Sequence, residues 1–249
     1  MSETTSTKPL SPELQARLEG IQVESGIFER WPDFRTMVIV VDGIDQAAIA
    51  AAIDPDQPSP LAIAEAAIQA RGVTDWTEHP HIVQWNDAYR DFGAKPKRTS
   101  PSVLALLKRV DGGLPRIDPV TDLYNSISVS HVLPIGGEDL SAYLGNPRLG
   151  IAVGSEPFDT MESGAPVIDH PLPGEVIWRD NFGVTCRRWN FRQGVRTLIT
   201  EKTTTALFIL EAMGAMPDAE LATAGAELIA GLLAVAPDLA IGSRVISAS

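Results

Sequence analysis

The 249-residue sequence predicts an α+β fold, in which helices dominate the first half of the chain and strands the second. Helix-start signals recur early, whereas short β-branched segments crowd the later part. The chain shows no internal repeat and no linker long enough to separate two domains. Its hydrophobic content of 44% can fill a sizeable core. We therefore expect a single domain over residues 11–249, preceded by a disordered polar lead over residues 1–10.

Three Ser-Pro pairs predict helix starts. Serine can accept hydrogen bonds from the free N–H groups of a first turn, and proline suits the first helical position. An apolar periodic run follows each pair and ends at a glycine, a common helix stop. The three helices are expected from Ser11-Pro12 to Gly20, from Ser59-Pro60 to Gly72 and from Ser100-Pro101 to Gly112. Two more are expected at His81–Phe92 and at Asp218–Ala236, where Pro237 ends the run.

Strand signals lie between and after these helices. Thr36–Val41 (TMVIVV) is continuously apolar, which is typical of a strand covered on both faces. The polar run Asp122–Asp139 is expected to be a strand followed by a turn, and Asp180–Gly183 reads as a hairpin turn. Proline and glycine cluster in 154–174, which favours a surface excursion. Further short strands are predicted at 148–153, 175–179, 184–189, 195–199, 206–210 and 241–246.

Composition favours an intracellular protein. The single cysteine, Cys186, cannot form an internal disulfide, which fits a reducing cytoplasm. The polar N-terminus lacks the apolar segment of a secretory signal. No run of about 18 apolar residues is present to span a membrane. We therefore expect a cytoplasmic protein without a membrane partner.

The charge distribution qualifies an otherwise acidic chain. A net charge of −12 opposes binding to nucleic acid, because phosphate contacts are made mostly by Lys and Arg. However, residues 85–116 carry seven basic side chains against three acidic ones, and residues 175–202 carry six against three. A locally positive face on an acidic body can attract an anionic ligand. Solvated surface charge is the alternative interpretation of both segments.

Three common kinds of site find little support. His79 and His81 could share one face of a strand, but zinc needs three or four ligands and no further Cys/His cluster accompanies them. This pair fits the entry to a helix better. Cys186 lies inside a predicted strand and is expected to be a small core residue. A nucleophile elbow, a Walker sequence and a G-x-G-x-x-G fingerprint are all missing from the sequence. We therefore expect no metal and no cofactor.

One polar cluster remains as a candidate site. On a strand, Ser128 and Ser130 would share one face and His131 would point to the other. Gly136-Gly137 would let backbone N–H groups approach a ligand closely. Such donors can hold a carbonyl oxygen as it becomes an oxyanion, and can orient a water beside it. The alternative is a well-capped polar turn with a hydrogen-bonded histidine. The full cluster is Asp122, Asn125, Ser128, Ser130, His131 and the turn Pro134–Asp139.

Two stretches of the chain carry a family resemblance. D-L-Y-N at Asp122–Asn125, followed by Pro134 and then Asp139, is similar to a D-x-T-N-Y…G-Q-P-x-H-A-F-D stretch. Phe208–Ala212 (FILEA) is similar to an L-L-E-x-A strand. Both patterns belong to the editing (B3/B4) module of the phenylalanyl-tRNA synthetase beta subunit, which this chain resembles as a free-standing protein over roughly residues 80–215. The resemblance implies a single B3/B4-like α+β domain, with mixed or antiparallel sheets flanked by helices.

The resemblance also implies roles for individual residues. In the synthetase, the module removes tyrosine mistakenly attached to the phenylalanine tRNA, and Glu211 falls on a glutamate that recognises the tyrosine hydroxyl. Asn125 and Pro134 match an asparagine and a proline beside the pocket. The family histidine falls on Gly136, so that its role would have to come from His131. A family arginine aligns nearest Pro115, with Arg116 displaced by one residue. The amino acid that is removed therefore need not be tyrosine.

The leading hypothesis is a trans-acting aminoacyl-tRNA deacylase, in which water attacks the ester of a mischarged tRNA. One alternative is a non-catalytic module that binds an amino-acid-like ligand or a protein partner, such as a synthetase. Another is a hydrolase of small esters or amides. DNA is not an expected partner. The predicted catalytic residues are His131, Gly136 and Gly137, and the predicted substrate-binding residues are Asn125, Ser128, Pro134, Glu138 and Glu211. The expected tRNA contacts are Arg90, Lys95, Lys97, Arg98, Arg187, Arg188 and Arg192.

Overall fold

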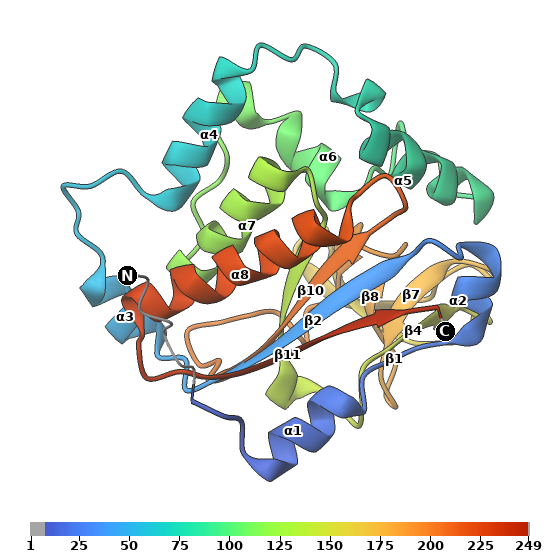
Figure 1. The fold of residues 1–249 in the computed structure, drawn as a ribbon. Coiled ribbons are helices and arrows are strands. Elements are labelled where there is room, and N and C mark those ends of the chain that lie inside the picture. The colour runs from blue at the N-terminus through green and yellow to red at the C-terminus, as the bar shows by residue number, and fades with distance from the viewer. Residues whose placement is uncertain (1–7, 249) are drawn as a thin grey trace.

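A four-stranded antiparallel sheet separates the two largest hydrophobic clusters of the protein (Figure 1). The computed structural model describes residues 8–248. The sheet order is β11-β2-β10-β3, with β2 at Arg35–Asp42, β3 at Ile135–Asp139, β10 at Thr205–Ala212 and β11 at Ala240–Ser247. Helices α7 (Pro119–His131) and α8 (Asp218–Val235) cover one face, and a second sheet lies against the other.

The second sheet is mixed. Its strand order is β1-β4-β7-β8-β5-β6, and β9 pairs with β8. The β1–β4 and β5–β8 pairs are parallel and the others are antiparallel. The predicted α+β class, with mixed and antiparallel sheets flanked by helices, is confirmed. The strands are β1 (Gln22–Val23), β4 (Arg148–Ile151), β5 (Phe158–Glu162), β6 (Ala165–Asp169), β7 (Val176–Arg179), β8 (Val184–Arg187) and β9 (Arg192–Gln193).

Most predicted helices form where the capping signals place them. Ser11 and Ser59 each accept a hydrogen bond from the backbone N–H three residues on, at 3.2 Å. At Ser100-Pro101 the helix starts one residue late, and Pro101 occupies the capping position without a side-chain bond. The helices are α1 (Pro12–Glu19), α2 (Ser25–Arg30), α3 (Gln46–Ala52), α4 (Pro60–Ala70), α5 (Pro80–Asp91) and α6 (Ser102–Leu107).

The prediction of a strand at the start of Asp122–Asp139 is wrong, because this segment lies in α7. Asp118 accepts hydrogen bonds from the N–H groups of Val120 and Thr121, and Pro119 takes the first helical position. This is the same cap-plus-proline signal that marks the Ser-Pro helices, with aspartate in place of serine. The expected turn after Pro134 is strand β3. The two-residue spacing of Ser128 and Ser130 was therefore wrongly interpreted as the periodicity of a strand.

Three smaller predictions also differ from the structure. Residues 195–199 form no strand in the described chain and contribute only an isolated bridge between Leu198 and Glu138. Residues 154–174 contain the β5–β6 hairpin in addition to loops. Helices α2 and α3 had no sequence signal that we recognised. The turn at Asp180–Gly183 is confirmed, because Asp180 N–H donates to the Gly183 carbonyl at 3.0 Å between β7 and β8.

The N-terminal segment is described from Lys8 onward. Residues 1–7, most of the predicted lead, lie outside the described part of the chain. Lys8 forms an isolated parallel bridge with Ala240, and its carbonyl accepts the N–H of Ile241 at 3.0 Å. Lys8 therefore pairs with the outer edge of β11. Leu10 packs against the cluster between the two sheets. Within residues 8–248, no helix is both long and apolar enough to cross a membrane.

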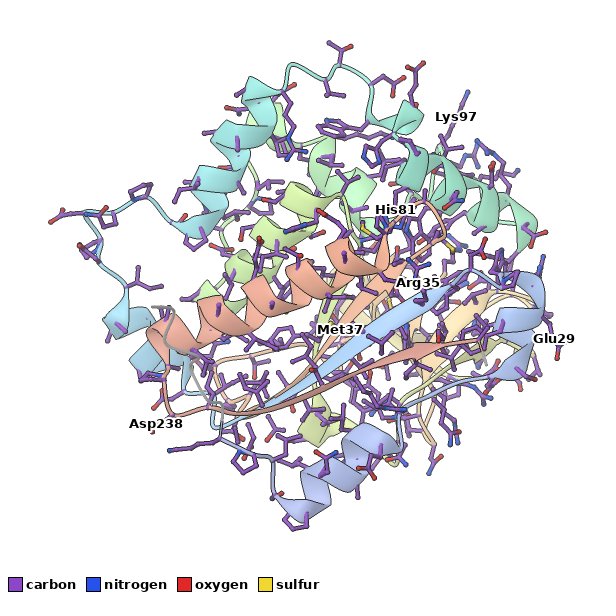
Figure 2. The ribbon with its side chains drawn as sticks, viewed as in Figure 1. Glu29, Arg35, Met37, His81, Lys97 and Asp238 are labelled. Carbon is purple, nitrogen blue, oxygen red and sulfur yellow. The ribbon has the colours of Figure 1, made fainter. Side chains whose placement is uncertain are left out.

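A buried histidine joins three parts of the fold. Nδ1 of His81 lies 2.8 Å from the Val132 carbonyl and therefore carries the proton. Its Nε2 accepts the Trp85 indole N–H at 3.1 Å and the Met213 backbone N–H at 3.0 Å. Burial lowers the pKa of His81 to about 4, which keeps the ring neutral. His81 thus connects α5 to the end of α7 and to the segment after β10 (Figure 2).

Replacing His81 with alanine should destabilise the protein by about 2–4 kcal/mol, because two buried N–H donors and one carbonyl lose their partner. The free energy of urea unfolding measures this loss. Val83→Ala on the same helix is the control, since Val83 is exposed and should change stability by less than about 0.5 kcal/mol. Equal effects of the two substitutions would contradict the role assigned to His81.

Candidate functional site

A cleft of about 340 Å³ opens above the β3–β10 edge of the four-stranded sheet. Its size falls within the roughly 300–1,000 Å³ of small-molecule sites. Its walls come from α6, from the first half of α7 and from the second sheet. The lining residues are Ser102, Ala105, Leu106, Arg109, Tyr124, Asn125, Ile135, Gly136, Glu138, Trp178, Cys186, Trp189, Asn190, Phe191, Gln193, Ile209 and Glu211.

Strand register determines the floor of the cleft. Ile209 lies opposite Gly136, and Leu207 lies opposite Glu138. Because side chains alternate between the faces of a sheet, Ile209 and Glu211 of β10 share a face with Gly136 and Glu138 of β3. A Cβ atom added to Gly136 would meet nothing within 4 Å, so this residue leaves an opening in the floor. The floor therefore has an empty centre between two carboxyl groups.

Glu211 lies at one end of this floor. Its side chain is buried, and the Trp178 indole N–H donates to one carboxyl oxygen at 2.8 Å. The Asn190 amide donates to the other oxygen at 2.9 Å. Burial raises the pKa of Glu211 to about 7, and these two hydrogen bonds only partly oppose that rise. A carboxyl group that titrates near neutrality lines the cleft.

Glu138 lies at the other end. It is 3% exposed, and the Tyr143 hydroxyl donates to its carboxylate at 2.5 Å. The Tyr143 oxygen also lies 3.1 Å from the Thr185 hydroxyl. Burial raises the pKa of Glu138 to about 6, more than the hydrogen bonds from Tyr143, Thr197 and Thr185 lower it. The cleft thus contains two acids whose pKa values are suited to proton transfer or to binding of a cation near pH 7.

The walls supply further polar groups. The Asn125 amide makes no side-chain hydrogen bond with any described residue and is 8% exposed. Arg109 is exposed at the mouth of the cleft. Burial raises the pKa of the Cys186 thiol well above its usual value, so the thiol stays protonated and is a poor nucleophile. Asn125 is therefore the wall residue best placed to bond a ligand.

Asn125, Gly136, Glu138 and Glu211 are the predicted site residues that line the cleft. His131 is not among them. Its two ring nitrogens lie 2.6 Å and 2.7 Å from carboxylate oxygens of Glu220 and Glu227 on α8. Six residues of helix after Asn125 turn the chain by about 600° and advance it by about 9 Å, which places His131 on another face of α7. His131 therefore cannot take the place of the family histidine at Gly136.

The other three predicted residues support the floor from below. Ser128 is buried, and its hydroxyl donates to the Leu133 carbonyl at 2.6 Å. The Pro134 carbonyl accepts the Glu211 N–H at 3.0 Å and fixes the register of β3. A Cβ atom on Gly137 would come within 2.8 Å of Ile199 and Tyr124. Gly137 therefore allows close packing of β3 against Tyr124 of α7 and against Ile199.

Hydrogen-bond alternation bears on the predicted oxyanion donors. Bonding between Glu211 and Pro134 implies that the peptide groups of Gly136 also face β10, because bonded pairs recur at every second residue. The peptide groups of Gly137 face the opposite edge of β3. There the Gly137 carbonyl accepts the Gln193 side-chain amide at 3.0 Å. Gly136 thus contributes open space to the cleft, because its N–H and C=O groups face β10. The peptide groups that face the free edge of β3 are those of Gly137.

The predicted basic contacts divide into two groups. Lys95, Arg98 and Arg188 line a second cleft of about 390 Å³, together with buried Glu175, whose carboxylate lies 3.2 Å from Arg188 Nε. Arg188 lies over the Phe191 ring at 5.7 Å, and Phe191 also lines the first cleft. The two clefts are therefore neighbours.

The remaining basic residues lie outside both clefts. Arg187 is buried and bonds Glu175 at 2.8 Å and 3.0 Å, so internal ion pairs occupy its guanidinium. Arg90 pairs with Asp87. Arg192 is exposed and donates to the Met161 carbonyl. Figure 2 shows Lys97 projecting from the surface beside α5.

Several cleft residues were missed by the sequence analysis. Trp178, Asn190 and Gln193 lie in or between short strands of the second sheet, and Tyr124 precedes Asn125 on α7. Only Tyr124 had a local signal, as part of the D-L-Y-N motif. The others reach the cleft through sheet packing. Residues 8–248 contain no group of three or more His, Cys, Asp or Glu side chains placed to hold a metal ion.

Comparison with known proteins agrees with the motif resemblance. A family model described as the B3/4 domain matches residues 84–217. No curated protein matches the chain significantly. Among solved structures, an N-terminal fragment of the phenylalanyl-tRNA synthetase beta-subunit from Pyrococcus horikoshii is similar at 11% identity, with a TM-score of 0.42 over 89% of this chain. The chain spans 49% of the length of that fragment.

Glu211→Gln should gain stability relative to the unaltered protein as pH rises from about 5 to about 8. The pKa of Glu211 is raised from 4.5 to about 7, so the folded protein holds this proton more tightly than the unfolded chain. Stability from that proton is complete below pH 4.5 and is lost as pH rises through about 7. Glutamine does not titrate, so the difference in unfolding free energy should shift by about 2–3 kcal/mol.

Urea unfolding at both pH values measures this shift. The lowered pKa of His81 makes stability rise with pH, which is opposite to the effect of Glu211. Because His81 is present in both proteins, its contribution cancels when their stabilities are compared at each pH. Glu29→Gln is the control, because Glu29 is exposed at the surface of α2 (Figure 2) and its difference from the unaltered protein should stay constant. A pH-independent difference for Glu211→Gln would contradict the raised pKa.

Proposed function

The chain belongs to the B3/4 domain family, and on that premise we propose that it is a trans-acting aminoacyl-tRNA deacylase. The observation that carries the proposal is the polar cleft, in which Glu211 and Asn125, the family-matched positions, lie around the open floor at Gly136. The cleft has the volume of an amino-acid-sized site. A basic cleft adjoins it, as a substrate with phosphate groups next to its reactive ester requires.

The reaction is hydrolysis of the ester that joins an amino acid to the terminal ribose. The oxygen of a water molecule bonds to the carbonyl carbon, the bond from that carbon to the ribose oxygen breaks, and a water proton ends on the ribose oxygen. The ester is already activated, and the neighbouring ribose hydroxyl can help to position the water. The protein therefore contributes mainly orientation and stabilisation of the developing charge.

Individual residues take distinct parts in this proposal. The Asn125 amide, which lacks an internal partner among the described residues, bonds the ester group or the water. Glu211, held by Trp178 and Asn190, accepts a hydrogen bond from a donor on the amino-acid side chain. Lys95, Arg98 and Arg188 contact the phosphates of the tRNA end. His131 has no part, because α8 carboxylates occupy both of its ring nitrogens.

One observation favours the non-catalytic alternative. The position of the family histidine is empty at Gly136, and no described histidine lines the cleft. A module that keeps the pocket without that side chain could bind an amino-acid-like ligand without hydrolysing an ester. Binding without turnover distinguishes this alternative from the deacylase.

A panel of mischarged tRNAs should include at least one that the purified protein deacylates faster than it hydrolyses spontaneously. Asn125→Ala should lower that rate at least tenfold, because the ester or water loses its donor. Gly136→Leu should lower it by a similar factor by filling the floor. Gly112→Leu adds the same side chain at another glycine with open space and should leave the rate within twofold.

The outcome of this assay separates the two functions. Release at the spontaneous rate for every tRNA would reject the deacylase and favour the binding module. Each variant must first show the unfolding transition of the unaltered protein, so that lost activity reports on the cleft.

Arg98→Ala combined with Arg188→Ala should weaken tRNA binding and flatten its salt dependence. Each lost phosphate contact lowers the steepness of the plot of log K against log salt by about 0.7–0.9, so the pair should lower it by up to about 1.4–1.8. Titration of labelled tRNA at several salt concentrations measures the slope. Arg17→Ala with Lys202→Ala removes two basic residues that line neither cleft, half-buried Arg17 and exposed Lys202, and is the control. An unchanged slope for the first pair would show that the basic cleft does not bind phosphates.

A further inference from the structure

The two carboxyl groups on the floor of the cleft are buried without a basic partner. Glu138 is 3% exposed and Glu211 2% exposed. Within residues 8–248, no Lys, Arg or His side chain lies within ion-pair distance of either carboxyl. Buried charges in proteins are normally paired, because removal of an ion from water is costly. An acidic pair without a basic partner that lines an open cleft is therefore available to a cationic or hydrogen-bond-donating group of a ligand.

The two acids lie at opposite ends of one floor. Glu138 is opposite Leu207 in the strand register, four residues along β10 from Glu211. At roughly 3.3 Å per residue the two positions are about 13 Å apart along the strand. Gly136 and Ile209 form the stretch between them. A ligand on this floor can therefore contact both acids only if it has a polar group at each end.

The two acids differ in the kind of group that hydrogen-bonds to them. Both oxygens of Glu211 accept a hydrogen bond, one from Trp178 and one from Asn190. For Glu138, the Tyr143 hydroxyl bonds one oxygen, and the Thr185 and Thr197 hydroxyls are further hydrogen-bond partners that lower its pKa. A carboxylate can accept about four hydrogen bonds. The donors around Glu138 are hydroxyl groups, which, unlike the N–H groups on Glu211, can themselves accept hydrogen bonds from an ammonium.

We propose that Glu138 binds the α-ammonium group of the aminoacyl ester, and this inference rests on the proposed deacylase function. The ammonium nitrogen is two bonds from the carbonyl carbon. With the ammonium at Glu138, the scissile carbonyl lies over the opening at Gly136 and within reach of the wall that holds Asn125. The side chain then runs along Ile209 toward Glu211. Glu138 thereby selects esters of free α-amino acids and rejects those whose amino group is acylated or missing.

The motif that the chain resembles does not contain this residue. In the stretch P-x-H-A-F-D, Glu138 stands where the pattern has phenylalanine, and Gly136 stands where it has histidine. Both departures lie on the cleft face of β3. The chain has exchanged an apolar side chain and an imidazole for a carboxylate and an open space. Recognition of the amino end by a carboxylate is therefore a property of this chain's own residues.

Glu138→Gln tests the proposal, because glutamine keeps the size of the side chain and loses its charge. The substrates are one tRNA that carries an amino acid and the same tRNA that carries the corresponding α-hydroxy acid. The unaltered protein should hydrolyse the α-amino ester with kcat/KM at least tenfold higher. Glu138→Gln should lower kcat/KM at least tenfold for the α-amino ester and by less than twofold for the α-hydroxy ester. Glu29→Gln is the control and should change neither value.

Other patterns of loss would overturn the proposal. An equal loss on both esters would assign Glu138 to activation of water or to structure, since neither role depends on the amino group. Equal rates of the unaltered protein on both esters would show that the amino group is not recognised. In either result the protein is still a deacylase, so the inference fails while the proposed function stands.

A binding measurement keeps the two failures apart. Calorimetry compares the methyl esters of a panel of amino acids with the matching esters that lack the amino group, for example tyrosine methyl ester with methyl 3-(4-hydroxyphenyl)propanoate. Binding of the amine alone, lost in Glu138→Gln, supports the proposal even if no tRNA is deacylated. Binding of both esters with equal affinity, or of neither, overturns it.

Discussion

Burial of strand β10 on both faces is the constraint on which the rest of the structure depends. Phe208 and Leu210 pack toward α7 and α8, whereas Leu207 and Ile209 face the second sheet. Glu211 continues that second face, so its carboxyl must find hydrogen bonds inside the protein. Trp178 from the second sheet and Asn190 from the loop after β8 provide them. The central strand of the core therefore also sets the position of the cleft.

Asn190 connects the buried strand β10 to the helices beside the cleft. Its amide nitrogen bonds Glu211, while its oxygen accepts the Tyr89 hydroxyl at 2.9 Å and the Ser102 N–H at 3.2 Å. One side chain thus ties β10 to α5 and to the start of α6. Arg188, two residues earlier in the same loop, belongs to the basic cleft and has a positive φ of 49°. Such a conformation is uncommon for a non-glycine residue and persists where surrounding contacts enforce it. The loop fixes the two clefts side by side.

Sequence reasoning was most accurate where a structural signal is local. Capping serines, first-turn prolines and β-branched runs identified α1, α4, β2 and β10, because each depends on neighbouring residues alone. It failed at α7, where an Asp-Pro start was overlooked and spaced serines were read as a strand. That single error moved His131 into the predicted site. In the structure, helical rotation turns His131 toward α8, whereas Asn125 keeps its place in the cleft.

The sequence by itself determined the α+β class, most of the elements and the family, because periodicity, caps and the order of short motifs are properties of the linear chain. Only the tertiary structure decided which polar residues meet. Glu138 and Glu211 are 73 positions apart, and the register of β3 on β10 brings them to one face. Arg187 and Arg188 are adjacent and both pair with Glu175, yet Arg187 is buried whereas Arg188 lines a cleft. Strand pairing and burial act between distant segments, and no local pattern encodes them.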